Sequence, residues 1–266
     1  MANGLKSPWY SPLRIASGNC AMTRLRYCFG WLLLMTALSC CIPLHADEGQ
    51  LLKPFSATFS VKRNIIPLGE LELEFKVNEQ GEYHYHAHTL PGMLVGWFSA
   101  DEIIEESYGT MLSGSIMPIS YTYNDQGEED DRAELKFDWQ VGEVHTTSSG
   151  ITWSQSITAG TQDRLSQQLL VRLHLAEGRK DISYQVADGG KIKSYRFLVE
   201  GEENIDTPYG QMRCLRVRRS KESRKPDYTI WFAPELDYLP VQIERQQSGR
   251  LYRMVLDEIT QETSED

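Results

Sequence analysis

The chain has 266 residues and a formal net charge of −10, with 41% hydrophobic and 10% aromatic residues. This composition excludes a disordered tail and allows a sizeable hydrophobic core. A pI near 5.2 argues against a nucleic-acid-binding protein, which needs a basic face, and a mean hydropathy of −0.42 excludes a polytopic membrane protein.

Residues 1–46 have the features of an export signal. They contain four basic residues and no acidic ones, whereas the remainder of the chain is acidic. Arg24 and Arg26 precede an apolar run from Tyr27 to Leu38. This run has the length of a signal-peptide core and is too short to span a bilayer. The sequence therefore predicts an exported protein.

The processing of this segment has two interpretations. In the first, Met22 is the true start and cleavage after Ala46 releases a single periplasmic domain over 47–266. In the second, the sequence Ala37-Leu38-Ser39-Cys40 is a bacterial lipoprotein box, and Cys40 carries a lipid anchor. Both interpretations place the protein outside the cytoplasm.

From Phe55 onward, apolar and polar residues alternate with a period of two, which is typical of half-buried antiparallel strands. In 71–77, apolar residues alternate with glutamate and lysine, and Pro67-Leu68-Gly69 is the expected turn before this strand. The other expected strands are 55–62, 83–89, 103–108, 119–124, 133–139, 143–148, 151–157, 182–186, 192–200, 212–220, 228–233, 240–246 and 251–259. Further turns are expected at 78–81, 124–127, 149–150, 188–190 and 248–249.

One segment breaks this rhythm. Residues 161–177 place leucines at helical spacing; Thr161 or Asp163 can cap the start, and Gly178 can end the helix. A sheet with this many strands curls or closes. We therefore expect a mainly β fold, namely a single antiparallel, strongly curved sheet or partly closed β-barrel with one central amphipathic helix.

Several short motifs in the sequence form a specific combination, although each motif alone is common. They are Asp163-Arg-Leu-Ser166 with Arg172, Thr207-Pro-Tyr-Gly210, Tyr228-Thr-Ile-Trp-Phe-Ala-Pro234, Tyr238-Leu-Pro-Val241, and Pro118 before a tyrosine-bearing strand. Together they resemble the domain of unknown function 3108 family of exported bacterial proteins. The resemblance covers nearly all of 47–266 and implies no catalytic residue. The end of the chain is also similar to periplasmic lipoprotein-carrier folds, in which a curved sheet wraps a helix and holds acyl chains.

The same motifs have a purely structural interpretation. Thr207 to Gly210 is a turn, because proline fixes φ and glycine allows positive φ. Trp231 is expected to fill the interior of the sheet. Arg172, on the third turn of the helix, is expected to pair with an acid on a strand.

His84, His86 and His88 project from one face of an expected strand. Two histidines at i and i+2 can share a zinc ion, so a metal site is one alternative and a pH-responsive patch is another. The favoured interpretation is a solvated strand face opposite Tyr83 and Tyr85.

An apolar segment follows this strand. Met93, Leu94, Trp97 and Phe98 lie between glycines and a proline, before an acidic stretch. They are our candidate ligand-binding residues, as a lip that meets an acyl chain or a membrane surface. The alternative is a core-facing loop.

Three other features receive structural interpretations. The acidic run 128–131 lacks calcium-loop spacing and is expected to be a solvated turn. The basic cluster Arg216, Arg218, Arg219, Lys221, Arg224 and Lys225 is expected at a solvated hairpin end, with lipid head groups as the alternative contact. Cys214 is the one cysteine outside 1–46 and is expected to be a buried, inert thiol.

No catalytic motif is present in the sequence. We therefore expect a non-enzymatic cell-envelope protein without cofactor or metal, which binds a lipid-like or other apolar ligand inside its sheet. The alternatives are a structural or interaction module with a solid core, and a metal-dependent hydrolase that uses His84 and His86. No nucleic-acid partner is expected, peripheral contact with the envelope is allowed, and the oligomeric state stays open.

Overall fold

The computed structural model describes residues 52–92, 102–112, 114–126, 132–221, 228–247 and 249–261. All of them lie within the domain expected over 47–266; the expected boundary at Ala46 lies outside the described residues. The strands are β1 (Phe55–Arg63), β2 (Ile66–Val77), β3 (Glu82–Pro91), β4 (Ile103–Leu112), β5 (Ser115–Asp125), β6 (Arg132–Asp138), β7 (Glu143–Ser148), β8 (Ile151–Ser156), β9 (Asp181–Asp188), β10 (Lys191–Thr207), β11 (Gly210–Lys221), β12 (Tyr228–Ala233), β13 (Leu239–Gln247) and β14 (Arg250–Gln261). The helices are α1 (Ser166–Ala176) and the short 3-10 helix η1 (Pro234–Leu236).

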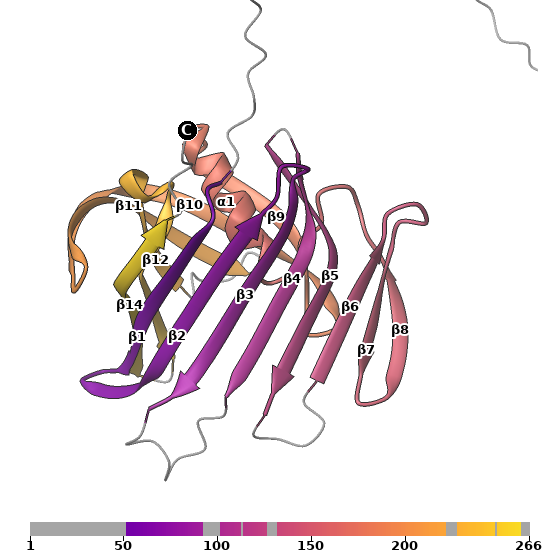
Figure 1. Ribbon diagram of the computed structural model, residues 1–266, viewed down its shortest axis with the longest axis horizontal. Coiled ribbons are helices and arrows are strands. Elements are labelled where there is room, and N and C mark those ends of the chain that lie inside the picture. Colours follow the sequence, from indigo (N-terminus) through magenta and orange to yellow (C-terminus); the bar gives the residue numbers. More distant parts are fainter. Residues whose placement is uncertain are drawn as a thin grey trace, which may run out of the picture. The chain divides into compact units, whose positions relative to one another are not determined.

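The strands form one 14-stranded sheet in the order β8-β7-β6-β5-β4-β3-β2-β1-β14-β13-β12-β11-β10-β9. Every neighbouring pair is antiparallel, and β1 pairs with β14, which joins the two halves of the chain. In Figure 1, β1 to β8 form the wall that faces the viewer, β9 to β11 lie behind it, and α1 lies at the upper end. The expected mainly β fold with one helix is confirmed.

The sheet is curved but is not closed into a barrel, because no ladder joins β8 to β9 among the described residues. Beside this seam, Gln162, in the segment between β8 and α1, forms a short bridge to β9. Its backbone N–H donates to Gln185 O at 2.9 Å, and its carbonyl accepts from Ala187 N at 2.8 Å. The indole N–H of Trp153 on β8 donates to Gly190 O at 3.4 Å from the other side of the seam.

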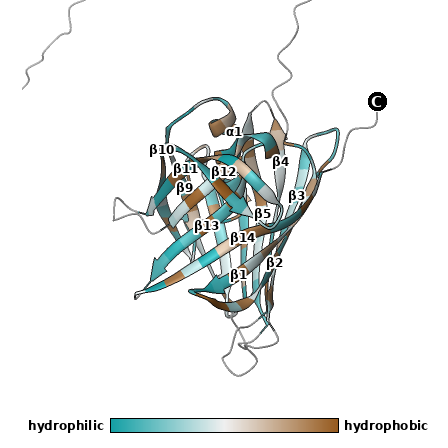
Figure 2. Cartoon of the chain, turned by 90° about the vertical axis from the view of Figure 1, so that its left-hand side faces the viewer, coloured by the Kyte–Doolittle hydropathy of each residue, from teal (hydrophilic) through white to brown (hydrophobic). Residues whose placement is uncertain are grey.

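The core lies on the concave face of the sheet, where alternate residues of each strand point inward. Phe55, Phe75, Tyr83 and Tyr85 form an aromatic cluster there, and the ring centres of Phe55 and Phe75 are 5.9 Å apart. Figure 2 shows β13, β14, β1 and β2 side by side, with hydrophobic and hydrophilic residues mixed along each strand. Alternation is thus the sequence property that builds this sheet.

The helix is shorter than the expected 161–177. Gln162 is occupied by the bridge to β9, so the helix begins only at Ser166. Gly178 ends it, with a φ of 78° and a hydrogen bond of 2.9 Å from its N–H to Leu175 O. No residue of α1 is fully exposed. None of the described helices is long and apolar enough to cross a bilayer.

The turn between β1 and β2 is not at Pro67-Leu68-Gly69, as the sequence had indicated, but at Asn64 and Ile65. Asn64 adopts a φ of 54°, which asparagine tolerates, and its side-chain oxygen accepts from Leu251 N at 3.0 Å. Gly69 lies inside β2. A Cβ there would lie 2.0 Å from Leu90 O, so the glycine permits the close approach of β3.

Candidate functional site

A cavity of about 510 Å³ lies between α1 and the concave face of the sheet. This volume falls within the range of roughly 300–1,000 Å³ that is typical of small-molecule sites. The apolar residues that line it are Phe59, Val61, Leu71, Leu73, Ala87, Leu165, Val171, Phe197, Ile230, Phe232, Pro240, Ile243 and Met254. The inner positions of β1, β2 and β3, together with the start and one face of the helix, supply about half of these apolar residues.

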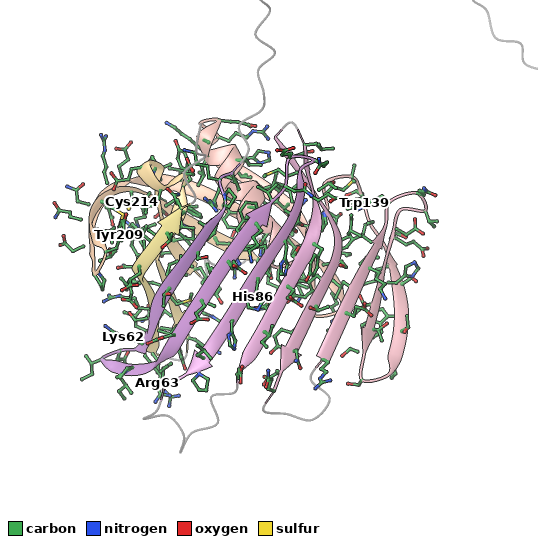
Figure 3. All side chains as sticks on the ribbon, viewed as in Figure 1. Lys62, Arg63, His86, Trp139, Tyr209 and Cys214 are labelled. Atoms are coloured by element: carbon green, nitrogen blue, oxygen red, sulfur yellow. The ribbon has the colours of Figure 1, made fainter. Side chains whose placement is uncertain are left out.

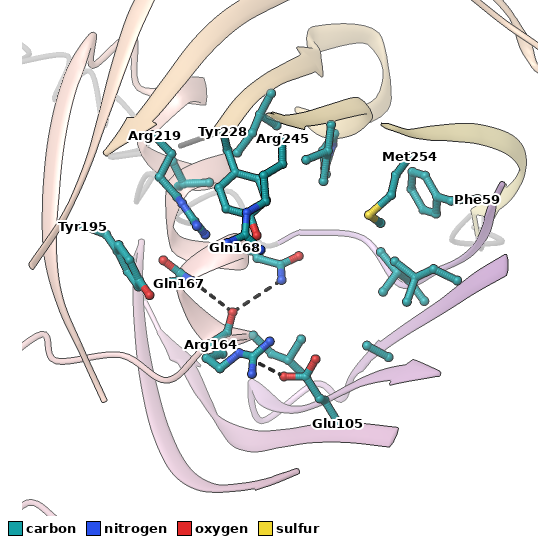
Figure 4. Close-up of a pocket in the computed structure, with 18 of the residues that line it drawn as sticks. Phe59, Glu105, Arg164, Gln167, Gln168, Tyr195, Arg219, Tyr228, Arg245 and Met254 are labelled. Atoms are coloured by element: carbon teal, nitrogen blue, oxygen red, sulfur yellow. Dashed lines mark hydrogen bonds and ion pairs between the residues drawn. The ribbon is translucent and has the colours of Figure 1, made fainter. Parts of the chain in front are cut away.

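The start of the helix supplies a polar part of the lining (Figure 4). The Arg164 guanidinium forms an ion pair with Glu105 at 3.3 Å, and Glu105 also accepts a hydrogen bond from the Tyr121 hydroxyl. The side-chain amides of Gln167 and Gln168 donate to Arg164 O at 3.2 Å and 3.4 Å. These contacts hold the charged groups of Arg164 and Glu105 at the edge of the apolar lining.

The opposite wall combines cations with aromatic rings. The guanidinium carbon of Arg219 lies 3.9 Å from the ring centre of Tyr228 and 4.7 Å from that of Tyr195. Arg245 lies 5.3 Å from the ring centre of Tyr228 (Figure 4), and Lys221 Nζ lies 5.8 Å from that of Tyr195. Each of these distances is in the range of a cation–π contact.

Asp188 is the acidic residue of this wall. It accepts from Lys193 Nζ at 2.8 Å and from the Tyr195 hydroxyl at 2.5 Å, and Lys221 Nζ lies 3.4 Å away. Burial alone would raise the pKa of Asp188, but the hydrogen bonds from Lys193 and Tyr195 lower it to about 2. The carboxylate is therefore ionised and fully engaged by its neighbours.

Arg219 and Lys221, which the sequence analysis placed in a basic cluster at a solvated hairpin end, line the cavity instead. Arg216 and Arg218 face outward and pair with Glu203 and Glu200 at 3.1 Å and 2.8 Å. Because side chains alternate along a strand, the next positions on β11 face the cavity. If the side chains of 217–221 had been assigned to alternate faces of the strand, Arg219 and Lys221 would have been placed on the inner face. Arg224 and Lys225 lie outside the described residues.

The expected ligand-binding residues Met93, Leu94, Trp97 and Phe98 lie outside the described residues, as does the acidic run 128–131. Thr89 and Glu105, which flank the apolar segment, both line the cavity. The role of the segment stays a prediction.

The three histidines alternate along β3 with the buried Tyr83 and Tyr85 and so lie on its outer face. Figure 3 labels the middle one, His86. His84 pairs with Glu106 at 3.1 Å and stacks on Tyr108, with ring centres 4.2 Å apart. His88 pairs with Glu102 at 2.7 Å. Within the part of the chain that the structure describes, no three potential ligands of a metal ion come together.

Arg172 differs from expectation because no acidic side chain among the described residues pairs with it. Its Nε donates to the backbone oxygen of Asp237 at 3.0 Å, and its guanidinium lies 4.8 Å from the ring centre of Phe55. The two terminal nitrogens have no hydrogen-bond partner among the described residues. Burial lowers the pKa of Arg172 to about 10.

Trp231 is part of the buried hydrophobic core, as expected, but it does not line the cavity. Its neighbours Ile230 and Phe232 line the cavity, so Trp231 points to the other face of β12. There it is 7% exposed and donates from its indole N–H to Glu203 at 2.8 Å.

Cys214 matches its expectation: it is buried, and burial raises the pKa of its thiol to about 11.

A family model described as a protein of unknown function, DUF3108, matches residues 57–255. No curated protein matches the chain by sequence. Among solved structures, the chain is similar to a β-barrel-like protein of domain of unknown function DUF1849 from Brucella abortus, with 12% identity and a TM-score of 0.55. The alignment covers 80% of this chain and 99% of that one. This likeness supports a barrel-like fold.

Two further structures are more distant. A candidate lipoprotein from Parabacteroides distasonis is 10% identical, with a TM-score of 0.37 and coverage of 79% of this chain and 100% of that chain. LprF from Mycobacterium bovis is 9% identical, with a TM-score of 0.16 and coverage of 77% and 84%. Both scores are too low to support an argument about this chain.

Proposed function

This chain belongs to the DUF3108 family, and we propose that it is a non-catalytic binding protein of the cell envelope that holds a lipid-like ligand in its cavity. The observation that carries the proposal is the cavity of about 510 Å³ with a mainly apolar floor. Each methylene group buried there contributes about 0.8 kcal/mol, so one acyl chain supplies the affinity of a typical ligand after the cost of ordering it.

The rival function is a structural module with a solid core. Such a core interdigitates its side chains to high density and leaves few voids larger than a water molecule. Here the aromatic cluster around Phe75 is packed in that way, whereas the space between Val171 and Leu73 is not. The contrast between the two regions of one concave face favours ligand binding.

The charged groups of the lining also fit binding better than catalysis. Glu105 is held by Arg164 and Tyr121, and Asp188 is held by Lys193 and Tyr195. A general acid or base needs access to the reacting group and a pKa near the working pH. Export to the envelope is part of the proposal and rests on the signal features of residues 1–46, with the lipid anchor at Cys40 as its alternative.

The test uses the full chain, purified after expression with its own N-terminal region. Native mass spectrometry detects co-purified lipid, and titration with the neutral fluorescent probe N-phenyl-1-naphthylamine measures the cavity itself. We expect saturable binding of one probe molecule. Thr89→Trp places an indole in the cavity and should weaken probe binding at least tenfold, because Thr89 lines it.

The matched control is His86→Trp, which adds the same group to the outer face of the same strand. It should bind the probe as the wild type does, and circular dichroism should show that both variants are folded. The proposal is wrong if the wild type binds neither lipid nor probe, or if Thr89→Trp binds the probe as well as His86→Trp.

A further inference from the structure

The cavity has a polarity that the proposed function does not by itself require. Its described lining contains four cations, Arg164, Arg219, Lys221 and Arg245, against two carboxylates, Glu105 and Asp188. The whole chain has a net charge of −10, so this local excess of positive charge is opposite to that of the protein. The net charge of the chain therefore does not explain the positive charge of the cavity lining.

Two arginines that face outward on the same sheet, Arg218 on β11 and Arg253 on β14, each have a carboxylate partner. Arg218 pairs with Glu200 at 2.8 Å, and Arg253 pairs with Glu244 at 2.7 Å. Arg245, on the inner face of β13, has no carboxylate partner among the described residues and lies over the ring of Tyr228. The cavity lining thus holds a positive charge, that of Arg245, which no carboxylate among the described residues neutralises.

The cavity wall that contains Arg219, Tyr228 and Arg245 is also held in place. Tyr228 lies between the guanidinium groups of Arg219 and Arg245, at 3.9 Å and 5.3 Å from its ring centre. Stacking on an aromatic ring orients a guanidinium and leaves its N–H edge able to donate to an anion. A planar fork of donors suits the oxygens of a carboxylate or a phosphate.

We propose that the cavity selects amphiphiles with an anionic head group, a carboxylate or a phosphate, which is bound by Arg245 and Lys221 beside Tyr228. The apolar chain then extends along Leu73, Ala87 and Val171 toward the helix. This inference rests on the proposed function and names the class of its ligand. A neutral ligand would cover the cations Arg245 and Lys221, which would lose hydration water without gaining an anionic partner from the ligand.

The test measures displacement of N-phenyl-1-naphthylamine from the full chain at pH 8 by palmitate, hexadecyl phosphate and hexadecan-1-ol, which share a chain length. We expect both anions to displace the probe at concentrations at least tenfold lower than the alcohol. Acetate and inorganic phosphate, without an acyl chain, should displace nothing at millimolar concentration, which separates an amphiphile from a free anion.

Two variants locate the effect. Arg245→Gln should reduce the preference for anions to less than threefold by weakening palmitate and hexadecyl phosphate alone. Arg250→Gln removes the same charge from an exposed position of the same hairpin, and it should keep the wild-type preference.

Each failure has a distinct signature. If the wild type binds the alcohol and palmitate equally, or if Arg245→Gln weakens all three ligands alike, the head-group inference is wrong and the apolar cavity stands. If inorganic phosphate displaces the probe as well as hexadecyl phosphate, the ligand is a free anion and the inference is wrong. If neither the probe nor any chain binds, the proposed function itself is wrong.

Discussion

The hydroxyl of Ser107 on β4 donates a hydrogen bond of 2.7 Å to the carboxylate of Asp163, and both residues are fully buried. Asp163 in turn accepts from the backbone N–H groups of Leu165 and Ser166 at 2.7 Å and 2.8 Å. One carboxylate therefore fixes the start of the helix and ties it to the sheet. The helix forms one wall of the cavity, so this contact also sets the position of the proposed site.

Removal of this carboxylate should destabilise the protein. In Asp163→Ala, two backbone donors and the Ser107 hydroxyl lose their acceptor, and we expect the free energy of unfolding at pH 5 to fall by about 2 kcal/mol or more. Urea denaturation followed by circular dichroism measures it. The exposed Asp206→Ala should change it by less than about 0.5 kcal/mol. Equal effects of the two variants would contradict the role of Asp163.

The same residue predicts a pH dependence. Burial raises the pKa of Asp163 to about 6, above its value in the unfolded chain of about 3.9. The folded state thus holds this proton more tightly. The resulting contribution to stability is complete below about pH 4 and is lost as the pH rises through 6.

We therefore expect the free energy of unfolding of the wild type, relative to Asp163→Asn, to fall by about 2 kcal/mol between pH 4 and pH 7. The comparison cancels the titration of other groups, since asparagine at 163 does not ionise. Urea denaturation of both proteins at half-unit steps of pH gives the difference. If the difference in the free energy of unfolding between wild type and Asp163→Asn is constant or rises with pH, then folding does not raise the pKa of the Asp163 carboxyl group.

Arg172 provides a third prediction. Its buried guanidinium has two nitrogens without a partner among the described residues, and this desolvation opposes folding. Arg172→Met keeps most of the volume, so we expect its free energy of unfolding to equal or exceed that of the wild type. Arg172→Ala leaves a void and should lose about 2–4 kcal/mol. A loss of more than about 2 kcal/mol in Arg172→Met would contradict this account.

Two glycines at register shifts of their strands give a matched pair. At Gly109 a Cβ would lie 2.3 Å from Met117 O and 2.7 Å from the ring of Tyr83. At Gly201 it would meet nothing within 4 Å. Gly109→Ala should lower the free energy of unfolding by about 2 kcal/mol or more, and Gly201→Ala by less than about 1 kcal/mol. Thermal and urea denaturation test both; the reverse order would refute the tight contact between β4, β5 and Tyr83.

The strands were predictable because alternation is a local property. Every expected strand is present, and 143–148 and 228–233 have their expected bounds. The expected role of Asp163 at the start of the helix is confirmed by its hydrogen bonds from the N–H groups of Leu165 and Ser166. The first helical residue was not predictable, because it depends on the partners of Gln162 at Gln185 and Ala187, which local sequence does not specify. Helical spacing alone assigned these residues to the helix.

The site was less predictable than the fold. Alternation placed Trp231 on one face of β12 correctly, but it could not tell which face is concave when both are buried. For β11, it could have indicated that Arg219 and Arg218 point to opposite faces. The pairing of β1 with β14, which brings Phe59 and Met254 to one cavity, joins residues almost 200 positions apart and leaves no local signal.

The seam between β8 and β9 gives the interior a freedom that a closed barrel lacks. In a closed barrel, strand number and shear fix the diameter, because widening breaks a ladder. Here the circumference is held by the Trp153–Gly190 contact and the short bridge at Gln162. Because no ladder joins β8 to β9 among the described residues, the two edges can separate without loss of a strand pairing, and we expect the space between sheet and helix to be less rigidly fixed than in a closed barrel.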